Sequence, residues 1–557
     1  MSDTGVVVSE VELKQRQSVM LVTCVITLAF LILAFPRAWT GRQTFDAPRD
    51  NVGFQAATRF ADGKGLSIPL QHTRDLPPDI ARALTPRDAA NVHGKAVPID
   101  FAGSVMLWAG LVALWRPLAL LLSPALTVAG GVLLLRIAQE LFELPKGSTL
   151  RAQRNFETWW LPFLLVLWFA HPGVIFNGSG IYGSEIPSMV FVLATLLYFL
   201  RFWQTGRPAD FRWMTLAAGA AVAVRYPNVI TLLSPGVMLL VTRRVRLRQI
   251  AEAAVLLAPF AILVLAFNNA VYGSPTATGY QLVNRVLQQT LNSPSSGLFG
   301  FHARAAVKHL HFYVIQLPII LEVPLLGIAL GVRRMPRASA LRVPLVVLLV
   351  SSFLTVAYYA GLGTFGSVSP VINASFVRYI LPAIAIGIAL GVYGFAMRRT
   401  RATQVIFVLL ILASVSLGMA GPGGIINRSR EIGRHKVLRA LVMRHTQPNA
   451  LIAARLADRD LFPERQTLTM TYLLENLDSS SVDTAVSQWD NLPSPERFAD
   501  VASRIRARGI PLYLLYDFPQ DIQPYGDALR AAGLQLVRRG ALGAPFPQLF
   551  AITPVNP

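Results

Sequence analysis

The chain has 557 residues, of which 53% are hydrophobic and only 15% are charged, and its formal net charge is +21. Soluble domains carry about 25% charged residues, and the shortfall arises because apolar runs of about 20 residues, long enough to cross a bilayer core, recur along the chain. The basic residues fall mainly in short loops between these runs, where positive charge sets membrane topology. The composition therefore argues against a soluble protein and against a nucleic-acid partner. The one cysteine, Cys24, excludes an intramolecular disulfide and a zinc site built on cysteine.

The first apolar run lies near the N-terminus. Residues 1–17 are polar and end in basic residues, so the positive-inside rule predicts that they are cytoplasmic. The run at 18–37 lacks a convincing cleavage site and is expected to be a retained anchor. A long outer loop follows at 38–100, and two short amphipathic helices are expected in it. The apolar stretch 101–115 is short for a span and is expected to lie in, or re-enter, the interface.

Ten further spans are expected after this loop. They lie at about 117–142, 157–176, 186–203, a pair of short spans within 213–241, 250–272, 312–332, 343–362, 379–396 and 404–420. A second long outer loop is expected at 273–310. With about 11 spans and a cytoplasmic N-terminus, every strongly basic short loop falls on the cytoplasmic side. An error of one helix would place several basic clusters outside, so the alternation supports this topology.

The composition changes from about residue 425, and no spanning run occurs between 425 and 557. Short apolar segments predict buried strands and intervening segments predict helices. The expected strands are at 450–453, 511–516 and 550–552, and the expected helices at 495–509 and 524–533. We therefore predict an α-helical polytopic membrane domain at 18–424, followed by a small soluble α/β domain outside the cytoplasm at 425–557.

Two acids follow the first span, Asp46 and Asp50. An acid at a membrane–water boundary can remove a proton from an acceptor hydroxyl, which makes Asp50 the candidate catalytic base. Asp46 could do the same, or could raise the pKa of Asp50 by like charge. The alternative for Asp50 is a helix N-cap, because a helical pattern follows it.

Glu185 is the third candidate catalytic acid, and it lies where the span at 186–203 begins. The alternative is again a capping role, because acids favour the positive end of a helix dipole and Pro187 suits a first turn. A function is favoured because Asp50 and Glu185 are both expected on the same face of the membrane.

Four basic residues are candidate anion binders. Arg225 interrupts an apolar stretch, and a charge within a membrane is costly enough to suggest a function. Arg378 lies at the outer end of a span, where snorkelling to the interface is the alternative. Arg304 and Lys308 give the second outer loop a positive strip that suits a phosphate. The expected substrate-binding residues are Arg225, Tyr226, Arg304, Lys308, Arg378, Tyr379 and Tyr182.

Several familiar site patterns are missing from the sequence. His302, His309 and His311 could bind a metal, but an interfacial basic patch is the favoured interpretation, so no metal site is predicted. The chain has no Walker loop, nucleophile elbow or Rossmann glycine pattern, which argues against energy coupling through cytoplasmic ATP. No cofactor is predicted, and a divalent cation is left open.

Five short motifs follow one another in the membrane part. They are Asp50-x-x-x-Phe54 running on to Gly63-x-Gly65-Leu66, then Tyr182-Gly183-Ser184-Glu185-Ile186-Pro187, then Arg225-Tyr226, then Asn292 to Phe299, and finally Arg378-Tyr379-Ile380-Leu381-Pro382. In this order they resemble the GT-C superfamily of integral-membrane glycosyltransferases, which includes protein O-mannosyltransferases and the lipid A aminoarabinose transferase.

The resemblance implies a GT-C-like fold and a sugar donor carried on a polyprenyl phosphate, used outside the cytoplasm with inversion at the anomeric carbon. Asp50 matches the catalytic acid of the first outer loop, and Glu185 matches the acid of the second. Arg378 matches a contact to the lipid phosphate. The chain departs from the pattern where many relatives have a second acid, since Asn51 stands there, and where a Lys-Pro-Pro stretch is reduced to Lys95-Ala96-Val97-Pro98. These departures leave the acceptor open.

The function implied is sugar transfer to a cell-envelope acceptor, such as the hydroxyl of a glycan, lipid or protein. The high content of Arg and Ala is typical of a GC-rich bacterium. The expected location is therefore a bacterial inner membrane, with the C-terminal domain in the periplasm. One alternative is a transporter or flippase of lipid-linked sugars, although the internal symmetry common in transporters is not seen. Another alternative is a membrane scaffold without catalysis.

Overall fold

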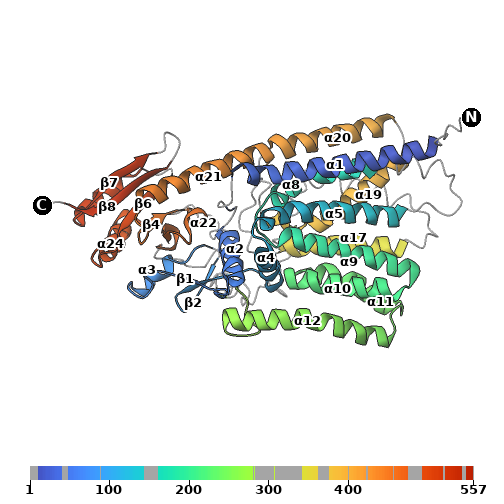
Figure 1. The fold of residues 1–557 in the computed structure, drawn as a ribbon, viewed down its shortest axis with the longest axis horizontal. Helices are drawn as coiled ribbons and strands as arrows, with labels where there is room; N and C mark the ends of the chain where they lie inside the picture. The colour runs from blue at the N-terminus through green and yellow to red at the C-terminus, as the bar shows by residue number, and fades with distance from the viewer. Residues whose placement is uncertain are drawn as a thin grey trace, which may run out of the picture.

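The structure, a computed structural model, describes residues 10–40, 45, 48–87, 89–142, 161–279, 282, 306–307, 342–361, 375–398, 401–421, 424–455, 457–473, 492–518, 521–541 and 547–555. Three parts follow one another along its long axis (Figure 1). A helical bundle, which includes the N-terminal helix, lies at one end of the molecule, and an α/β domain lies at the other end. Between them lies a thin layer built from the described residues of the first long loop, 38–100, which we call the loop layer.

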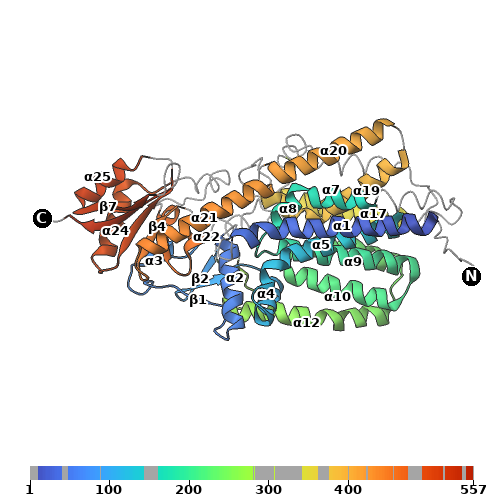
Figure 2. The ribbon, with the colours of Figure 1, turned by 45° about the horizontal axis from the view of Figure 1, so that its top comes forward.

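The bundle consists of long apolar helices that run along the long axis of the molecule (Figures 1 and 2). They are α1 (Glu10–Thr40), α5 (Leu118–Phe142), α7 (Leu161–Ala170), α9 (Glu185–Thr205), α10 (Pro208–Val224), α11 (Asn228–Val241), α12 (Leu247–Tyr272), α17 (Arg342–Gly361), α19 (Leu381–Arg398) and α20 (Arg401–Ala420). Among the described residues, 6 helices are long and apolar enough to cross a membrane. The polytopic membrane fold predicted from the sequence is thus confirmed.

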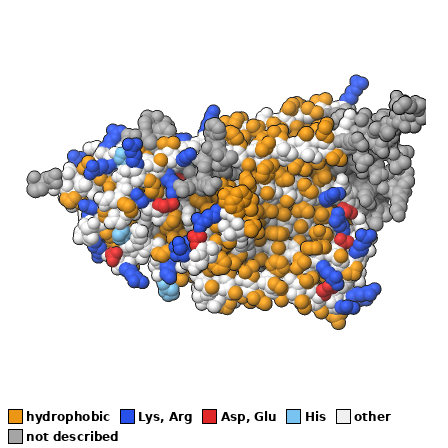
Figure 3. Space-filling model, viewed as in Figure 1, with side chains coloured by type: hydrophobic (Ala, Val, Ile, Leu, Met, Phe, Trp, Pro, Cys, Tyr) orange, Lys and Arg blue, Asp and Glu red, His pale blue; other side chains and the backbone are white. Residues whose placement is uncertain are grey.

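The helices differ in how far the bundle covers them. In α9, 78% of the apolar spanning window is buried inside the protein, whereas in α12 the share is 6%. A helix covered on all sides lies at the centre of a bundle, and an apolar helix left uncovered faces lipid. Figure 3 shows the result as a broad band of hydrophobic side chains over the bundle, with Lys and Arg gathered at the end away from the α/β domain.

The helix bounds correct the predicted spans at two places. The span predicted at 157–176 is two helices, α7 and α8 (Pro172–Gly178), because Pro172 begins a new helix after His171. The span predicted at 379–396 is preceded by a separate short helix, α18 (Ser375–Tyr379). The predicted pair of short helices within 213–241 is confirmed by α10 and α11. The span predicted at 312–332 lies outside the described residues.

The loop layer contains the two short helices that were predicted, α2 (Pro48–Ala61) and α3 (Pro78–Ala83). It also contains a small antiparallel sheet that was not predicted, in the order β1-β3-β2, formed by β1 (Ile68–Pro69), β2 (Ala89–Val92) and β3 (Lys95–Pro98). The apolar helix α4 (Ala102–Leu114) packs against α2. Both helices lie across the end of the bundle rather than along it (Figures 1 and 2). The loop layer therefore covers the open end of the bundle.

The C-terminal α/β part has a five-stranded sheet in the order β5-β4-β6-β8-β7. Its elements are β4 (Leu451–Ala454), α22 (Asp458–Leu461), β5 (Gln466–Thr469), the 3₁₀ helix η3 (Met470–Leu473), α24 (Pro495–Arg506), β6 (Leu512–Tyr516), α25 (Gln523–Ala531), β7 (Leu534–Ala541) and β8 (Gln548–Pro554). The strands β5, β4 and β6 are parallel, and β8 and β7 extend the sheet in antiparallel fashion. The predicted strands and helices are confirmed, whereas β5 and β7 were not predicted.

The sequence did not predict the helix that joins the bundle to the α/β part. Residues 425–445 form α21 (Ile425–His445), which follows α20 and lies beside the C-terminal end of α1 (Figure 1). Helix α3 of the loop layer also shares one hydrophobic core with the sheet, since Ile80 and Leu84 pack with Leu451 and Phe498. The boundary at 425 stays a prediction, because the core of the α/β part includes residues from the first loop.

Candidate active site

A polar cavity of about 140 Å³ lies where the loop layer meets the bundle. Four of the residues that line it were predicted site residues from distant parts of the sequence. They are Asp50 on α2, Tyr182 before α9, Glu185 at the start of α9, and Arg378 on α18. The structure thus brings these four predicted site residues together. Asp46, Arg304 and Lys308 lie outside the described residues.

Glu185 is the acid on which the arginines of the site converge. Its Oε1 accepts a hydrogen bond from Arg49 Nη2 at 2.8 Å, and it lies 3.5 Å from Arg225 Nη1 and 3.5 Å from Arg378 Nε. The residue is 6% exposed, and its place in the first turn of α9 also suits a negative charge. Glu185 therefore holds three guanidinium groups from three separate elements in one place.

Arg49 is a central residue of the site that the sequence did not single out. Its Nη2 binds Glu185, while its Nε lies 3.7 Å from Asp50 Oδ1 and 3.4 Å from Asp100 Oδ1. Arg49 is 4% exposed, although a polar residue between Pro48 and Asp50 gave no local sign of burial. It connects the acids of the loop layer to the acid of the bundle.

Asp100 is the second site residue that the sequence did not reveal. It is 1% exposed, and its Oδ1 lies 3.4 Å from Arg49 Nε. Burial raises the pKa of Asp100 to about 6, although the nearby Arg49 guanidinium opposes the change. Its position between β3 and α4 resembled an ordinary turn, so only the folded arrangement shows that it faces Arg49.

Arg225 lies behind Glu185 in an aromatic enclosure. It is 4% exposed, its Nε donates to the Tyr359 hydroxyl at 2.9 Å, and its guanidinium carbon lies 3.9 Å from the centre of the Tyr379 ring. Stacking on aromatic faces stabilises a guanidinium that is removed from water. The structure places Arg225 beside the site but not among the residues that line the cavity.

The two predicted tyrosines near these arginines differ in their contacts. Arg378 Nη2 donates to the Tyr379 hydroxyl at 2.7 Å, so Tyr379 helps to orient Arg378. Tyr226 instead donates its hydroxyl to Asn268 Oδ1 at 3.2 Å, and it does not line the cavity. The structure therefore joins Tyr379 to the site and separates Tyr226 from it.

Tyr182 forms part of the cavity wall close to helix α2. Its ring lies 5.4 Å from that of Trp108, and a Cβ on Gly53 would lie 2.5 Å from its ring carbons. Gly53 is thus required for the ring to approach α2. Gly183 has a φ of +151°, a backbone conformation that glycine adopts more readily than other residues, and it shapes the turn before Glu185.

The site combines guanidinium groups that differ in exposure with carboxylates beside them. Arg378 is the most exposed of the three arginines, with 23% of its side chain exposed against 5% for Arg49 and Arg225. Asp50 and Asp100 lie beside Arg49, whose Nε is 3.7 Å and 3.4 Å from their Oδ1 atoms. Such an arrangement can hold an anion at the arginine end and a hydroxyl donor at the carboxylate end. Within the described residues, no three His, Cys, Asp or Glu side chains gather to hold a metal ion.

Two crystal structures of ArnT from Cupriavidus metallidurans are similar to this chain over almost its whole length. The structure bound to undecaprenyl phosphate matches with a TM-score of 0.51 and 15% identity, covering 96% of this chain and 97% of ArnT. The apo structure matches with a TM-score of 0.52 and 14% identity, with the same coverage of 96% and 97%. No protein-family model and no curated protein matches the chain. The likeness confirms the predicted GT-C-like fold.

Proposed function

We propose that this chain, which has the fold of ArnT, transfers a sugar from a polyprenyl-phosphate donor to a hydroxyl of a cell-envelope acceptor, with inversion at the anomeric carbon. The observation that carries the proposal is the cavity, which is lined by both Arg378 and Asp50. It lies where an apolar bundle meets a layer of polar loops, which suits a substrate with a lipid tail and a polar head.

The arginine end of the cavity suits the lipid phosphate. Arg378 lines the cavity and remains partly exposed, so its guanidinium can reach a phosphate oxygen. Glu185 and Tyr379 hold this side chain in place before the donor arrives. ArnT bound to undecaprenyl phosphate has the same fold and supports a polyprenyl phosphate as the lipid partner. The phosphate is the leaving group, and positive charge beside it stabilises the charge that develops as the glycosidic bond breaks.

The carboxylate end suits the acceptor. Asp50 lies in the first turn of α2 and lines the cavity, where it can accept the proton of the attacking hydroxyl or orient that hydroxyl. Arg49 lies beside Asp50, with its Nε 3.7 Å from Asp50 Oδ1, and can help to orient the carboxylate. Attack from the face opposite the phosphate inverts the anomeric carbon.

The proposal includes an orientation in the membrane. The bundle end that carries most of its Lys and Arg lies away from the α/β part (Figure 3). The positive-inside rule supports a cytoplasmic position for this end, and we expect the cavity and the α/β part to lie in the periplasm of a bacterial cell. The lipid-linked donor then diffuses laterally to the cavity from the outer leaflet.

A transfer assay with purified full-length protein tests the proposal. Undecaprenyl-phosphate mannose, glucose and aminoarabinose, each radiolabelled in the sugar, are offered together with a cell-envelope extract. Asp50→Asn is compared with Asp75→Asn, an exposed acid in the same loop. We expect one donor to be consumed, a loss of about 10²–10⁴-fold in Asp50→Asn, and no loss in Asp75→Asn. A folded Asp50→Asn protein with full transfer activity would contradict the role of Asp50, and donor binding without turnover would favour a flippase or a scaffold.

A further inference from the structure

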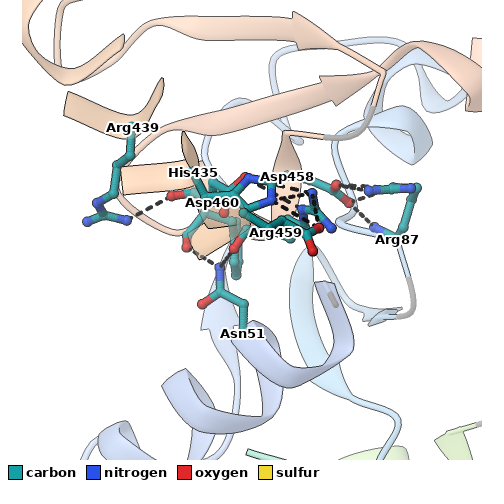
Figure 4. Close-up of polar contacts among 9 residues, drawn as sticks. Asn51, Arg87, His435, Arg439, Asp458, Arg459 and Asp460 are labelled. Carbon is teal, nitrogen blue, oxygen red and sulfur yellow. Dashed lines mark hydrogen bonds and ion pairs between the residues drawn. The ribbon is translucent and has the colours of Figure 1, made fainter. Parts of the chain in front are cut away.

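The residue next to Asp50 is bonded to the other end of the chain. Asn51 is 1% exposed, and its amide Nδ2 donates to the carbonyl oxygens of Arg459 at 3.0 Å and Phe462 at 2.6 Å. Figure 4 shows Asn51 rising from α2 toward α22 of the α/β part. Both hydrogens of the amide group are thus used to hold the main chain of α22 and the residue that follows it.

An apolar contact accompanies these hydrogen bonds. The side chain of Phe462 is 2% exposed and packs with Val52, the residue after Asn51. The same small core contains four residues of the loop layer, namely Ile68, Leu70, Ala89 and Ala96. Two consecutive residues of α2 therefore contact the end of α22, one through polar groups and one through apolar packing. A shift of α2 relative to α22 would break both contacts.

The short helix α22 is itself fixed from both sides. Arg87 of the loop layer binds Asp458 through its side chain, at 2.6 Å from Nη2 to Oδ1, and through its backbone N–H, at 2.7 Å to Oδ2. From α21, Arg439 Nη1 donates to the Asp460 carbonyl at 2.8 Å, and His435 Nδ1 lies 2.9 Å from Asp460 Oδ2 (Figure 4). Because α21 in turn packs against α1, α22 is tied to the bundle.

We propose that α22 positions the active site: by binding Asn51 it fixes the first turn of α2 and so holds the Asp50 carboxylate at the cavity. This inference rests on the proposed function, since the role of Asp50 comes from there. Asn51 does not line the cavity and touches no substrate, so it is a positioning residue. The α/β part is then a component of the catalytic centre rather than an appended binding domain.

The chemistry of the contact requires an amide at this position. Two carbonyl oxygens need two N–H donors, and only an Asn or Gln side chain supplies them from one group. An ionised carboxylate would face both carbonyl oxygens with no hydrogen to donate, and an Ala would leave both buried oxygens unpaired. In Asn51→Asp the side chain keeps its size, but the change removes the two bonds and adds a buried negative charge beside the two carbonyl oxygens.

The expected effect of Asn51→Asp is on turnover. A small displacement of a catalytic group lowers the rate of the chemical step, by about 10–100-fold for a shift of the order of 1 Å. The KM for the donor should stay close to the wild-type value, because Arg378 and its supports belong to the bundle side of the site. The ratio of variant to wild-type activity should rise as the pH falls, because protonation of the substituted side chain restores one donor.

Asn91→Asp is the matched control. Asn91 belongs to the same loop layer, is exposed, and bonds within that layer through Nδ2 to Thr85 Oγ1 at 3.1 Å and through Oδ1 to the Gly94 N–H at 3.0 Å. The same chemical change there leaves the contact between α2 and α22 intact, so wild-type kcat is expected. Phe462→Leu, which only trims the apolar contact, is the second variant should Asn51→Asp fail to fold.

The experiment measures two properties of the full-length protein in detergent. The first is kcat and KM with the undecaprenyl-phosphate sugar that the transfer assay shows to be consumed. The second is hydrogen exchange of the amides in residues 48–61, which does not depend on any donor. A lower kcat with a near-constant KM, together with faster exchange in α2, supports the proposal. An unchanged kcat, or a change confined to KM, overturns it.

The two proposals fail in different ways. Should the wild-type protein consume none of the three donors, the proposed function is contradicted, and the exchange measurement alone decides whether α22 fixes α2. Faster exchange of residues 48–61 in Asn51→Asp than in Asn91→Asp would then support the anchoring, and equal exchange would overturn it.

Discussion

Two buried charged clusters meet the loop layer, and they are built differently. Arg87 and Asp458 form a matched pair, in which the guanidinium and a backbone N–H together satisfy both carboxylate oxygens. Around the cavity, three guanidinium groups converge on one oxygen of Glu185, and the buried Asp100 lies 3.4 Å from Arg49 Nε. Buried charges are stable when they are paired and hydrogen-bonded. The matched pair therefore joins two parts of the protein, whereas the unmatched cluster is poised to accept a ligand.

Among the substitutions that test this comparison, Glu185→Gln is expected to have the largest effect on stability and transfer activity. Removing the shared carboxylate leaves the buried Arg49 and Arg225 and the partly exposed Arg378 without their common partner, which should lower the free energy of unfolding by about 3–5 kcal/mol and transfer activity by at least about 100-fold. The measurement is thermal unfolding together with the transfer assay. The control is Glu140→Gln, whose partner Arg201 lies 2.8 Å away in a half-exposed pair. Equal effects of the two changes would contradict the central role of Glu185.

The convergence on Glu185 also shows what the sequence could and could not predict. Hydropathy alone indicated the bundle, because each span is a continuous local signal. Arg225 and Arg378 were suspected because a charge in or beside an apolar run is costly. Arg49 and Asp100 lie in polar surroundings where a charge is ordinary, so only the folded chain reveals their burial.

The same reasoning applies to the α/β part. Its apolar strands β4, β6 and β8 were visible as short hydrophobic segments, whereas β5 (Gln466–Thr469) is made mostly of polar residues and gave no such signal. Helix α21 was missed because its many charged residues hide the face that packs against α1. The absence of a second acid at position 51 looked like a departure without a cause, and the contact of Asn51 with two carbonyl oxygens supplies one.

Asp458→Asn tests the matched pair. The substitution leaves the buried Arg87 guanidinium without its ionic partner, and we expect the free energy of unfolding to fall by about 3 kcal/mol. The affinity for undecaprenyl phosphate should not change, because this pair lies away from the cavity. Thermal unfolding and lipid titration measure the two properties, with Asp527→Asn, from an exposed pair, as control. A loss of lipid affinity without a loss of stability would reverse our distinction between the clusters.

Asp100→Asn tests the cavity cluster through the pH dependence of the free energy of unfolding. Because the pKa of Asp100 is raised from its ordinary value of 3.8 to about 6, the folded protein holds a proton between these pH values that the unfolded chain has released. Stability from this group is therefore lost as the pH rises toward 6, and the ionised carboxylate destabilises the fold above it. We expect Asp100→Asn to gain up to about 3 kcal/mol over the wild type near pH 8, and almost nothing near pH 4. An equal difference at both pH values would contradict the assignment.

The smallest effect is expected at the surface of the loop layer. Arg116 forms an ion pair with Asp62, and the two side chains are 60% and 32% exposed. Exposed pairs contribute little, so Arg116→Gln should change the free energy of unfolding by less than about 1 kcal/mol. Chemical or thermal unfolding measures it. A change as large as that of Asp458→Asn would mean that burial does not separate the important pairs from the others.

The central claim is that the arginine end of the cavity binds a polyprenyl phosphate. Its most direct test is the affinity of the full-length protein for undecaprenyl phosphate, measured by titration in detergent for the wild type, Arg378→Gln and Arg116→Gln. We predict that Arg378→Gln binds about 10–100-fold more weakly, because it loses a charge-assisted hydrogen bond to the phosphate, while Arg116→Gln binds like the wild type. Equal affinity in all three proteins would contradict the claim.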